Sequence, residues 1–407
     1  MATYTISQQP ALFSPAYNDL VFVVTSSNKT QTSFNYIATI YIGSDQITLK
    51  SPADPTYGSG VFNFGRIVEA YVNSDIDKST YGFQRNTNSY IGYYVKFGEE
   101  YGSTITQYLN ITTSVVKYVW NGVLDFLETQ TYNQDGYTME GAGTFLTSFL
   151  GERNQLTGDY SWLYWVADGS SPTSLSHMDI KSYTSAGALI KSVGFTNPYS
   201  SSGTITNHFA RFSTGKPQLN TFATIDMRYG TSPAIPSNAA YYKVAFQDAS
   251  SGTISSIVTY NIVDSDCKYT AYRLHFLNRL GGFDSYNFTK VSHNTTEIKK
   301  SQYKAPIGAL TSASAFGYNK YDRGDRQYSI ISKDTIKLSS DWLSEAESTW
   351  LRELVESPEI YLDDSTYGLV SVTCQETRYE KKQQVNEKLF RLEIDLNYSY
   401  NRYRQRY

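Results

Sequence analysis

The pattern of hydrophobic and polar positions predicts a chain that folds mostly as β-strands. Near the end, the hydrophobic residues of Phe390–Tyr400 alternate with polar ones, which is typical of a strand with one buried and one wet face. At ~3.4 Å per residue, such a strand would exceed about 35 Å. Other apolar or β-branched runs predict further strands at 20–24, 34–42, 47–49, 90–97, 115–120, 162–166, 188–193, 241–246 and 254–263.

Two glycine-containing dipeptides between apolar runs predict turns. At Asn121-Gly122 we expect a two-residue hairpin turn with a return strand over 123–127. At Gly281-Gly282 we expect a sharp corner, because glycine accepts a positive φ without steric cost. Phe283 and Tyr286 would then anchor the strand that follows this corner.

One helix stands out in the last third of the chain. Ser344 and Glu347 form the capping-box pattern, in which a hydroxyl and a carboxylate each accept from the other residue's amide. Pro358 disfavours helix in the residue before it, so we expect the helix to end near Ser357. The apolar positions behind the cap share one face: Trp350, Leu351, Leu354 and Val355. A shorter helix is expected within 64–72.

These elements predict a mainly β fold with two or three β-sandwich-like modules and a C-terminal α+β element that contains the one clear helix. We place an N-terminal β domain at 1–132 and a β-sandwich domain similar to immunoglobulin or fibronectin-III modules at 133–265. The remaining residues, 266–407, would form a C-terminal α+β assembly domain.

The composition favours a protein that packs and binds over one that catalyses. Of 407 residues, 37 are tyrosine, which suits half-buried surfaces, strands and protein–protein contacts. A net charge of −3 is too weak to hold nucleic acid through phosphate contacts alone. No apolar run approaches the ~20 residues that span a bilayer, and the first residues lack a secretory signal pattern. We therefore expect a soluble chain made in a cytoplasm, without a membrane span.

Little in the sequence points to catalysis or to a cofactor. The 4 histidines are scattered without metal-ligand spacing, and Cys267 and Cys374 lack a zinc or disulfide pattern. We read His275 as a structural histidine in a strand. The paired carboxylates Asp264/Asp266 and Asp363/Asp364 are interpreted as turn and cap residues, since Asp pairs in loops usually have that role. We predict no catalytic, metal or cofactor residues and hence no enzyme.

The end of the chain is the candidate assembly interface. Arginines and tyrosines alternate there, a combination used both for nucleic-acid contact and for docking on a neighbouring subunit, and we favour docking. The preceding alternating strand would either cap the core or add to the sheet of a partner. The predicted interface residues are Phe390, Leu392, Tyr398, Tyr400, Arg402, Tyr403, Arg404 and Arg406.

Several segments resemble structural proteins of tailed bacteriophages that infect Bacteroidetes, the crass-like phages among them. The strongest is Cys267–Tyr286, with the sequence HFLNRLGGFDSY at its end. Further similarity lies in Asp341–Ser344, Ser357–Leu362, Tyr379–Phe390 and Asn121–Leu124. The resemblance covers the last 140 residues well and the rest loosely. It carries no catalytic residue.

The resemblance implies a virion protein of the phage tail or neck, synthesised in the host cytoplasm and assembled as a homo-oligomeric ring or hub component. Its expected partners are sister subunits and other tail, neck or portal proteins; whether packaged DNA in a central channel is also contacted is left open. One alternative is a carbohydrate- or receptor-binding β-sandwich protein of the tail, in which Trp162 and Trp165 stack on sugars. A second is a β-sandwich glycoside hydrolase.

Overall fold

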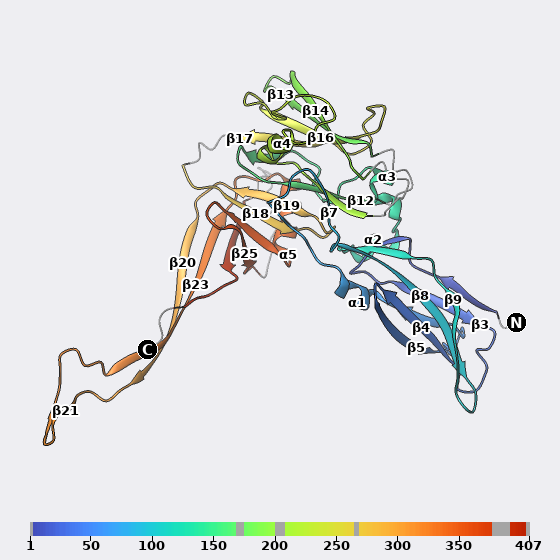
Figure 1. Cartoon of the computed structure of the whole chain (residues 1–407), viewed down its shortest axis with the longest axis horizontal. Helices are drawn as coiled ribbons and strands as arrows, with labels where there is room; N and C mark the ends of the chain where they lie inside the picture. Colours follow the sequence, from blue (N-terminus) through green and yellow to red (C-terminus); the bar gives the residue numbers. More distant parts are fainter. Residues whose placement is uncertain (1–2, 168–174, 200–207, 264–267, 377–390, 404–407) are drawn as a thin grey trace. The chain divides into compact units, whose positions relative to one another are not determined.

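The structure is a computed structural model that describes residues 3–167, 175–199, 208–263, 268–376 and 391–403 (Figure 1). The chain is mainly β, as predicted, with several sheets and a few short helices. It divides into two compact units. Unit 1 comprises Met1–Ser265 and Leu277–Ser285, and unit 2 comprises Asp266–Phe276 and Tyr286–Tyr407.

The first part of unit 1 is a sandwich of two sheets around a hydrophobic core. Phe22 and Val95, which come from different sheets, are both fully buried in that core. The smaller sheet has the order β1 (Tyr4–Gln8), β3 (Val21–Ser26), β6 (Gly60–Asn63). The larger has the order β2 (Phe13–Pro15), β10 (Lys117–Trp120), β8 (Tyr90–Tyr101), β4 (Asn35–Ile42), β5 (Asp45–Pro52), and β9 (Thr106–Thr113) also pairs with β8.

The second part of unit 1 also pairs two sheets. Trp165 and Phe246, one from each sheet, lie edge to face with ring centroids 4.9 Å apart. One sheet has the order β11 (Arg153–Leu156), β17 (Val258–Val263), β16 (Tyr241–Gln247), β13 (His177–Tyr183), β14 (Leu189–Thr196). The other has the order β12 (Trp162–Ala167), β15 (His208–Ser213), β7 (Phe83–Arg85). Because β7 comes from the N-terminal region, the two parts of unit 1 share strands.

Short helices connect the strands of unit 1. None of them exceeds seven residues in the described part of the unit. They are α1 (Gly65–Val68), η1 (Glu69–Tyr71), α2 (Phe126–Gln130), η2 (Gln134–Gly136), α3 (Met139–Ala142) and α4 (Lys216–Phe222). The helix expected within 64–72 is therefore confirmed as α1 and η1.

Unit 2 is built on one long antiparallel sheet with a helix. The sheet order is β19 (Phe283–Phe288), β18 (Tyr272–Leu277), β24 (Ile360–Asp364), β25 (Gly368–Cys374), β26 (Glu393–Tyr398), β23 (Asp325–Ser339), β20 (His293–Lys304). In addition, β27 (Arg402–Tyr403) pairs with β23, and β21 (Ala309–Ser312) pairs with β22 (Ala315–Gly317).

The predicted C-terminal helix is confirmed as α5 (Glu345–Glu356). The Ser344 hydroxyl accepts from the Glu347 amide at 3.2 Å, and the Glu347 carboxylate accepts from the Ser344 amide at 2.9 Å. Trp350 and Leu354 are buried, and the Trp350 ring lies 5.7 Å from that of Phe276. The cap and the apolar stripe thus place this helix as the sequence indicates.

The prediction of a hairpin at Asn121-Gly122 is wrong. The described chain has no return strand over 123–127; it enters α2 instead, and the Glu128 carboxylate accepts from the Asp125 amide at 3.0 Å. This local capping bond begins a helix within four residues of the glycine. Strand β10 finds its partners elsewhere, parallel to β2 and antiparallel to β8.

Candidate functional site

The most distinctive feature of unit 2 is a long antiparallel hairpin, residues 293–339, which we call the arm. Its strands β20 and β23 have 12 and 15 residues and pair from His293↔Lys337 to Lys304↔Asp325. At ~3.4 Å per residue, β20 alone spans about 40 Å. Figure 1 shows the arm extending away from the other strands of its sheet, with β21 near its tip.

Most of the arm is only two strands wide. Strand β26 pairs with β23 over Thr335–Ser339, and β27 pairs at Ile331 and Ser332. Before Ile331, β23 pairs only with β20 among the described strands, and every residue of β20 is exposed. A two-stranded hairpin is marginally stable in water unless a third strand or another surface covers it. The arm is therefore a hairpin that no further described strand covers over most of its length.

Beyond the base of the arm, where Ile336 and Leu338 are buried, hydrophobic side chains are exposed. Single exposed apolar residues are ordinary, but a run of them indicates an interaction surface. Their exposed fractions lie between 43% and 80%, for Ile298, Tyr303, Ile307, Leu310, Phe316, Tyr318, Tyr321 and Tyr328. The arm also contains eight Lys and Arg residues against four Asp and Glu. It is thus basic, whereas the whole chain is slightly acidic.

The base of the arm is fixed by contacts within unit 2. The Asp334 carboxylate of β23 accepts from the Thr296 hydroxyl across the hairpin and from the Arg402 guanidinium, both at 2.7 Å. On the same strand, the ion pair of Lys337 with Glu393, at 3.1 Å, raises the pKa of the lysine above its ordinary value. These contacts hold β26 and β27 against β23, so the arm begins from an ordered sheet.

The predicted interface strand Phe390–Tyr400 is shorter and more central than expected. It is β26, which has β25 on one side and β23 on the other. The strand ends at Tyr398, and the Ser399 amide donates to the Ser371 carbonyl at 3.1 Å. The alternation is observed, with Leu392, Ile394 and Leu396 buried. Because both edges of β26 are paired, this strand caps the core of unit 2 and leaves no free edge for a partner.

The other predicted interface residues lie around the base of the arm. Burial raises the pKa of Tyr398, whose ring lies 5.7 Å from that of the exposed Tyr400. Arg402 is engaged by Asp334 of its own chain, and Tyr403 is 61% exposed. Outside the described residues lie Phe390, Arg404 and Arg406.

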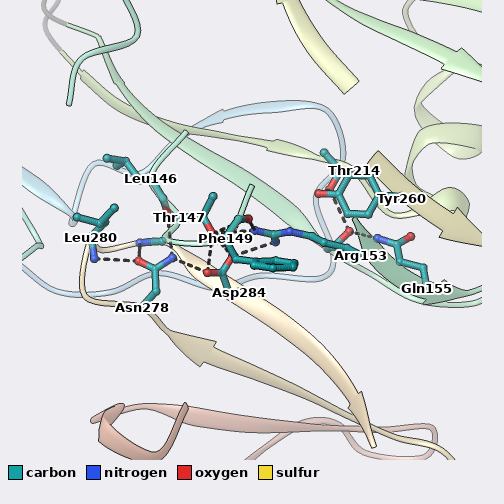
Figure 2. Close-up of polar contacts among 12 residues, drawn as sticks. Leu146, Thr147, Phe149, Arg153, Gln155, Thr214, Tyr260, Asn278, Leu280 and Asp284 are labelled. Carbon is teal, nitrogen blue, oxygen red and sulfur yellow. Dashed lines mark hydrogen bonds and ion pairs between the residues drawn. The ribbon is translucent and has the colours of Figure 1, made fainter. Parts of the chain in front are cut away.

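A buried network of polar side chains in unit 1 is the second candidate site (Figure 2). Asp284 accepts from the Arg153 guanidinium at 2.9 Å, from the Thr147 hydroxyl at 2.8 Å and from the Asn278 amide at 3.0 Å. Arg153 also donates to the Phe149 carbonyl at 2.8 Å. The side chains of Arg153 and Asp284 are 5% and 3% exposed, so substrate has no access to them. We therefore assign the network a structural role: its hydrogen bonds stabilise unit 1.

The same network fixes the turn at Gly281-Gly282 that the sequence predicts. Asn278 donates to the Leu146 carbonyl at 2.9 Å and accepts from the Gly282 amide at 3.1 Å. Gly281 has φ +89°, and a Cβ there would lie 1.9 Å from the Asn121 carbonyl oxygen, a contact that no side chain can make. The predicted corner is therefore confirmed, and Phe283 is buried behind it.

The residues that would support the alternative functions have structural roles. Trp162 and Trp165 are 1% and 0% exposed, so they cannot stack on a sugar. His275 is buried in β18 with Asp363 3.5 Å away, while Asp364 accepts from the turn amides that follow it. The pair Asp264/Asp266 and Cys267 lie outside the described residues, and Cys374 is a free, half-buried thiol.

Two absences hold for the described part of the chain. No three His, Cys, Asp or Glu side chains are grouped there to hold a metal ion. No helix among the same residues is both long and apolar enough to cross a membrane.

Comparison with protein-family models finds no match for this chain, and comparison with curated proteins finds none either.

Sequence reasoning missed the arm, because β20 has no alternation of apolar and polar residues. The sequence does offer one signal for a long hairpin. Two long stretches that can form strands flank a region that contains Gly308, Gly317 and Gly324. The candidate site is therefore the arm together with the C-terminal strands at its base.

Proposed function

We propose that this chain is a structural subunit that acts by assembly, as a ring or hub component of the tail or neck of a bacteriophage particle. The observation that carries the proposal is the arm, whose apolar side chains between Ile298 and Tyr328 are exposed and contact one another, as Tyr303 and Tyr328 do, instead of a core. Burial of apolar surface is the main driving force of stable association. A subunit that projects such an arm gains this burial only when a neighbour covers it.

The phage assignment comes from the resemblance of the segments around Cys267–Tyr286 and Tyr379–Phe390 to structural proteins of tailed phages that infect Bacteroidetes. A tail or neck subunit needs strong interfaces with its sisters and with adjoining rings, and it needs no reaction centre. The closed, buried character of the Arg153–Asp284 network agrees with that requirement. The virion is thus the proposed location, with sister subunits and other tail proteins as partners.

Immunogold labelling of purified phage particles tests this function. One antibody is raised against the arm tip, around Leu310–Tyr321, and a second against Asp125–Tyr137 of unit 1. The second antibody is the control, because it detects the chain even if assembly covers the arm tip. The proposal expects peptides of the chain in purified particles, and gold at the tail or neck with the control antibody. Particles that lack the chain, or gold over the capsid alone, would contradict it.

A further inference from the structure

The outer edge of β9 in unit 1 is a strand edge without charged or proline residues. Among the described strands β9 pairs only with β8, and seven of its eight residues are exposed. Natural edge strands are commonly shielded by charged residues, by proline or by a β-bulge, because an open edge recruits another strand. From Tyr101 to Val116 the chain contains neither a charged residue nor a proline. On either side of a bulge, this edge is therefore open to pairing with another chain.

Apolar side chains accompany this edge. A bulge interrupts the pairing of β9 with β8, and Asn110 adopts φ 58° within it. On the opposite strand, a Cβ at Gly98 would lie 2.4 Å from the Tyr108 carbonyl oxygen, so the bulge needs glycine there. The exposed apolar residues around the bulge have exposed fractions of 42% to 60%: Ile105, Tyr108, Leu109, Ile111, Val115 and Val116. We call this surface the β9 edge.

We propose that the β9 edge of one copy receives the arm of a second copy, with β20 added to the sheet beside β9. This inference rests on the proposed function and names the surface through which the subunits join. β20 ends its own sheet, so its outer backbone groups have no strand partner among the described strands, and its lysines would face the acidic unit 1 of the second copy. Its 12 residues are long enough to cover the 8 residues of β9. Main-chain bonds between two such edges give affinity, and the side chains set the register.

Charge favours a second copy as the occupant. The arm has eight basic residues against four acidic ones, and unit 1 has 15 basic residues against 20 acidic ones. An arm of one copy and unit 1 of another therefore attract each other, whereas two arms repel. Arm and β9 edge are different surfaces, so the contact is heterologous; repeated from copy to copy, it closes a ring when the rotation permits.

Cross-linking between two single-cysteine versions of the full chain tests the inference. Cys267 and Cys374 are replaced by serine in both. One version has Leu109→Cys at the β9 edge, and the other has Ile298→Cys or Tyr303→Cys on the arm, which allows for two registers. Equal amounts are mixed under mild oxidation and analysed by mass.

The inference expects a disulfide-linked dimer that forms in the mixture and contains one copy of each version. The matched control replaces Leu109→Cys by Ile225→Cys, another exposed apolar position of unit 1 with 69% exposure, which should give at least tenfold less dimer. Leu109→Lys should weaken self-association at least tenfold, and Ile225→Lys should not.

The remaining outcomes overturn the inference in distinguishable ways. Chains that assemble in light scattering but give no arm-to-edge dimer refute the β9 edge as the receptor and leave the proposed function standing. A dimer that forms equally well with Ile225→Cys shows random collision, which refutes the inference as well. Chains that neither assemble nor cross-link refute this inference; labelling of the phage particle then decides separately whether the proposed function survives.

Discussion

Replacing Asp284 by alanine should destabilise unit 1 more than any substitution at an exposed ion pair. The carboxylate is buried and receives hydrogen bonds from Arg153, Thr147 and Asn278. Its removal takes away the carboxylate that lies 2.9 Å from the Arg153 guanidinium, whose side chain is 5% exposed. Breaking a buried pair in this way costs about 3–5 kcal/mol, because the remaining charge stays desolvated. This is a large part of the ~5–15 kcal/mol that stabilises a typical folded protein.

Glu69→Ala is the matched control within the same unit. Glu69 pairs with Arg66 at 3.1 Å, but the side chain of Arg66 is 92% exposed. Solvent screens such a pair, and its loss should change the free energy of unfolding by about 0–1 kcal/mol. The difference between the two variants therefore isolates the effect of burial.

Urea unfolding followed by tryptophan fluorescence measures both changes. Trp120, Trp162 and Trp165 are buried in unit 1 and report on its unfolding. Replacing both members of the pair, in Arg153→Met/Asp284→Leu, should cost less than Asp284→Ala alone, since no unpaired charge is left behind. A free energy of unfolding for Asp284→Ala within about 1 kcal/mol of that for Glu69→Ala would refute the stabilising role of the network.

Three further predictions concern the corner, a buried histidine and the cap of α5. Gly281→Ala should destabilise unit 1 well beyond Gly43→Ala in thermal unfolding: both residues have positive φ, but only at Gly281 would a Cβ strike a backbone oxygen. Equal losses would contradict the close approach. Burial, followed by the Arg228 charge, lowers the pKa of His177. The unfolded state therefore binds more protons below about pH 6.5, and stability should fall as the pH drops through that value. His177→Phe should flatten this slope in denaturant midpoints measured from pH 5 to 7; an unchanged slope would exclude His177 as its source. Ser344→Ala should cost ~1 kcal/mol in chemical unfolding, whereas Ser344→Asp should cost much less, because aspartate also caps; equal costs would argue against the cap.

Where a segment packs on its own chain, the sequence predicted it well. The run 162–166 became β12, whose residues are all buried, because a continuous apolar run is typical of a strand buried on both faces. The stripe behind Ser344 became α5, because the period of its apolar residues reports which face is buried. The arm escaped prediction for the opposite reason. Every residue of β20 is exposed, so this strand has no buried face and carries no alternation that a pattern could reveal.

Each wrong or missing prediction also has a physical cause. Alternation in Phe390–Tyr400 identified the buried face of β26, but it contains no information on which edges are paired. At Asn121-Gly122, the Asp125–Glu128 capping interaction outweighed the turn signal and started a helix. The partnership of Arg153 with Asp284, 131 residues apart, arises from the three-dimensional fold and has no local sequence signature.

Light scattering of the native chain and of two tyrosine variants tests the central claim, that the arm joins subunits, most directly. Tyr321 on the arm and Tyr367 elsewhere in unit 2 are both 80% exposed, so Tyr321→Glu and Tyr367→Glu are closely matched. The native chain and Tyr367→Glu should give a defined multiple of the 45.9 kDa monomer, and Tyr321→Glu should shift the mass toward the monomer. A native chain that stays at 45.9 kDa at every concentration, or variants that assemble alike, would contradict the account.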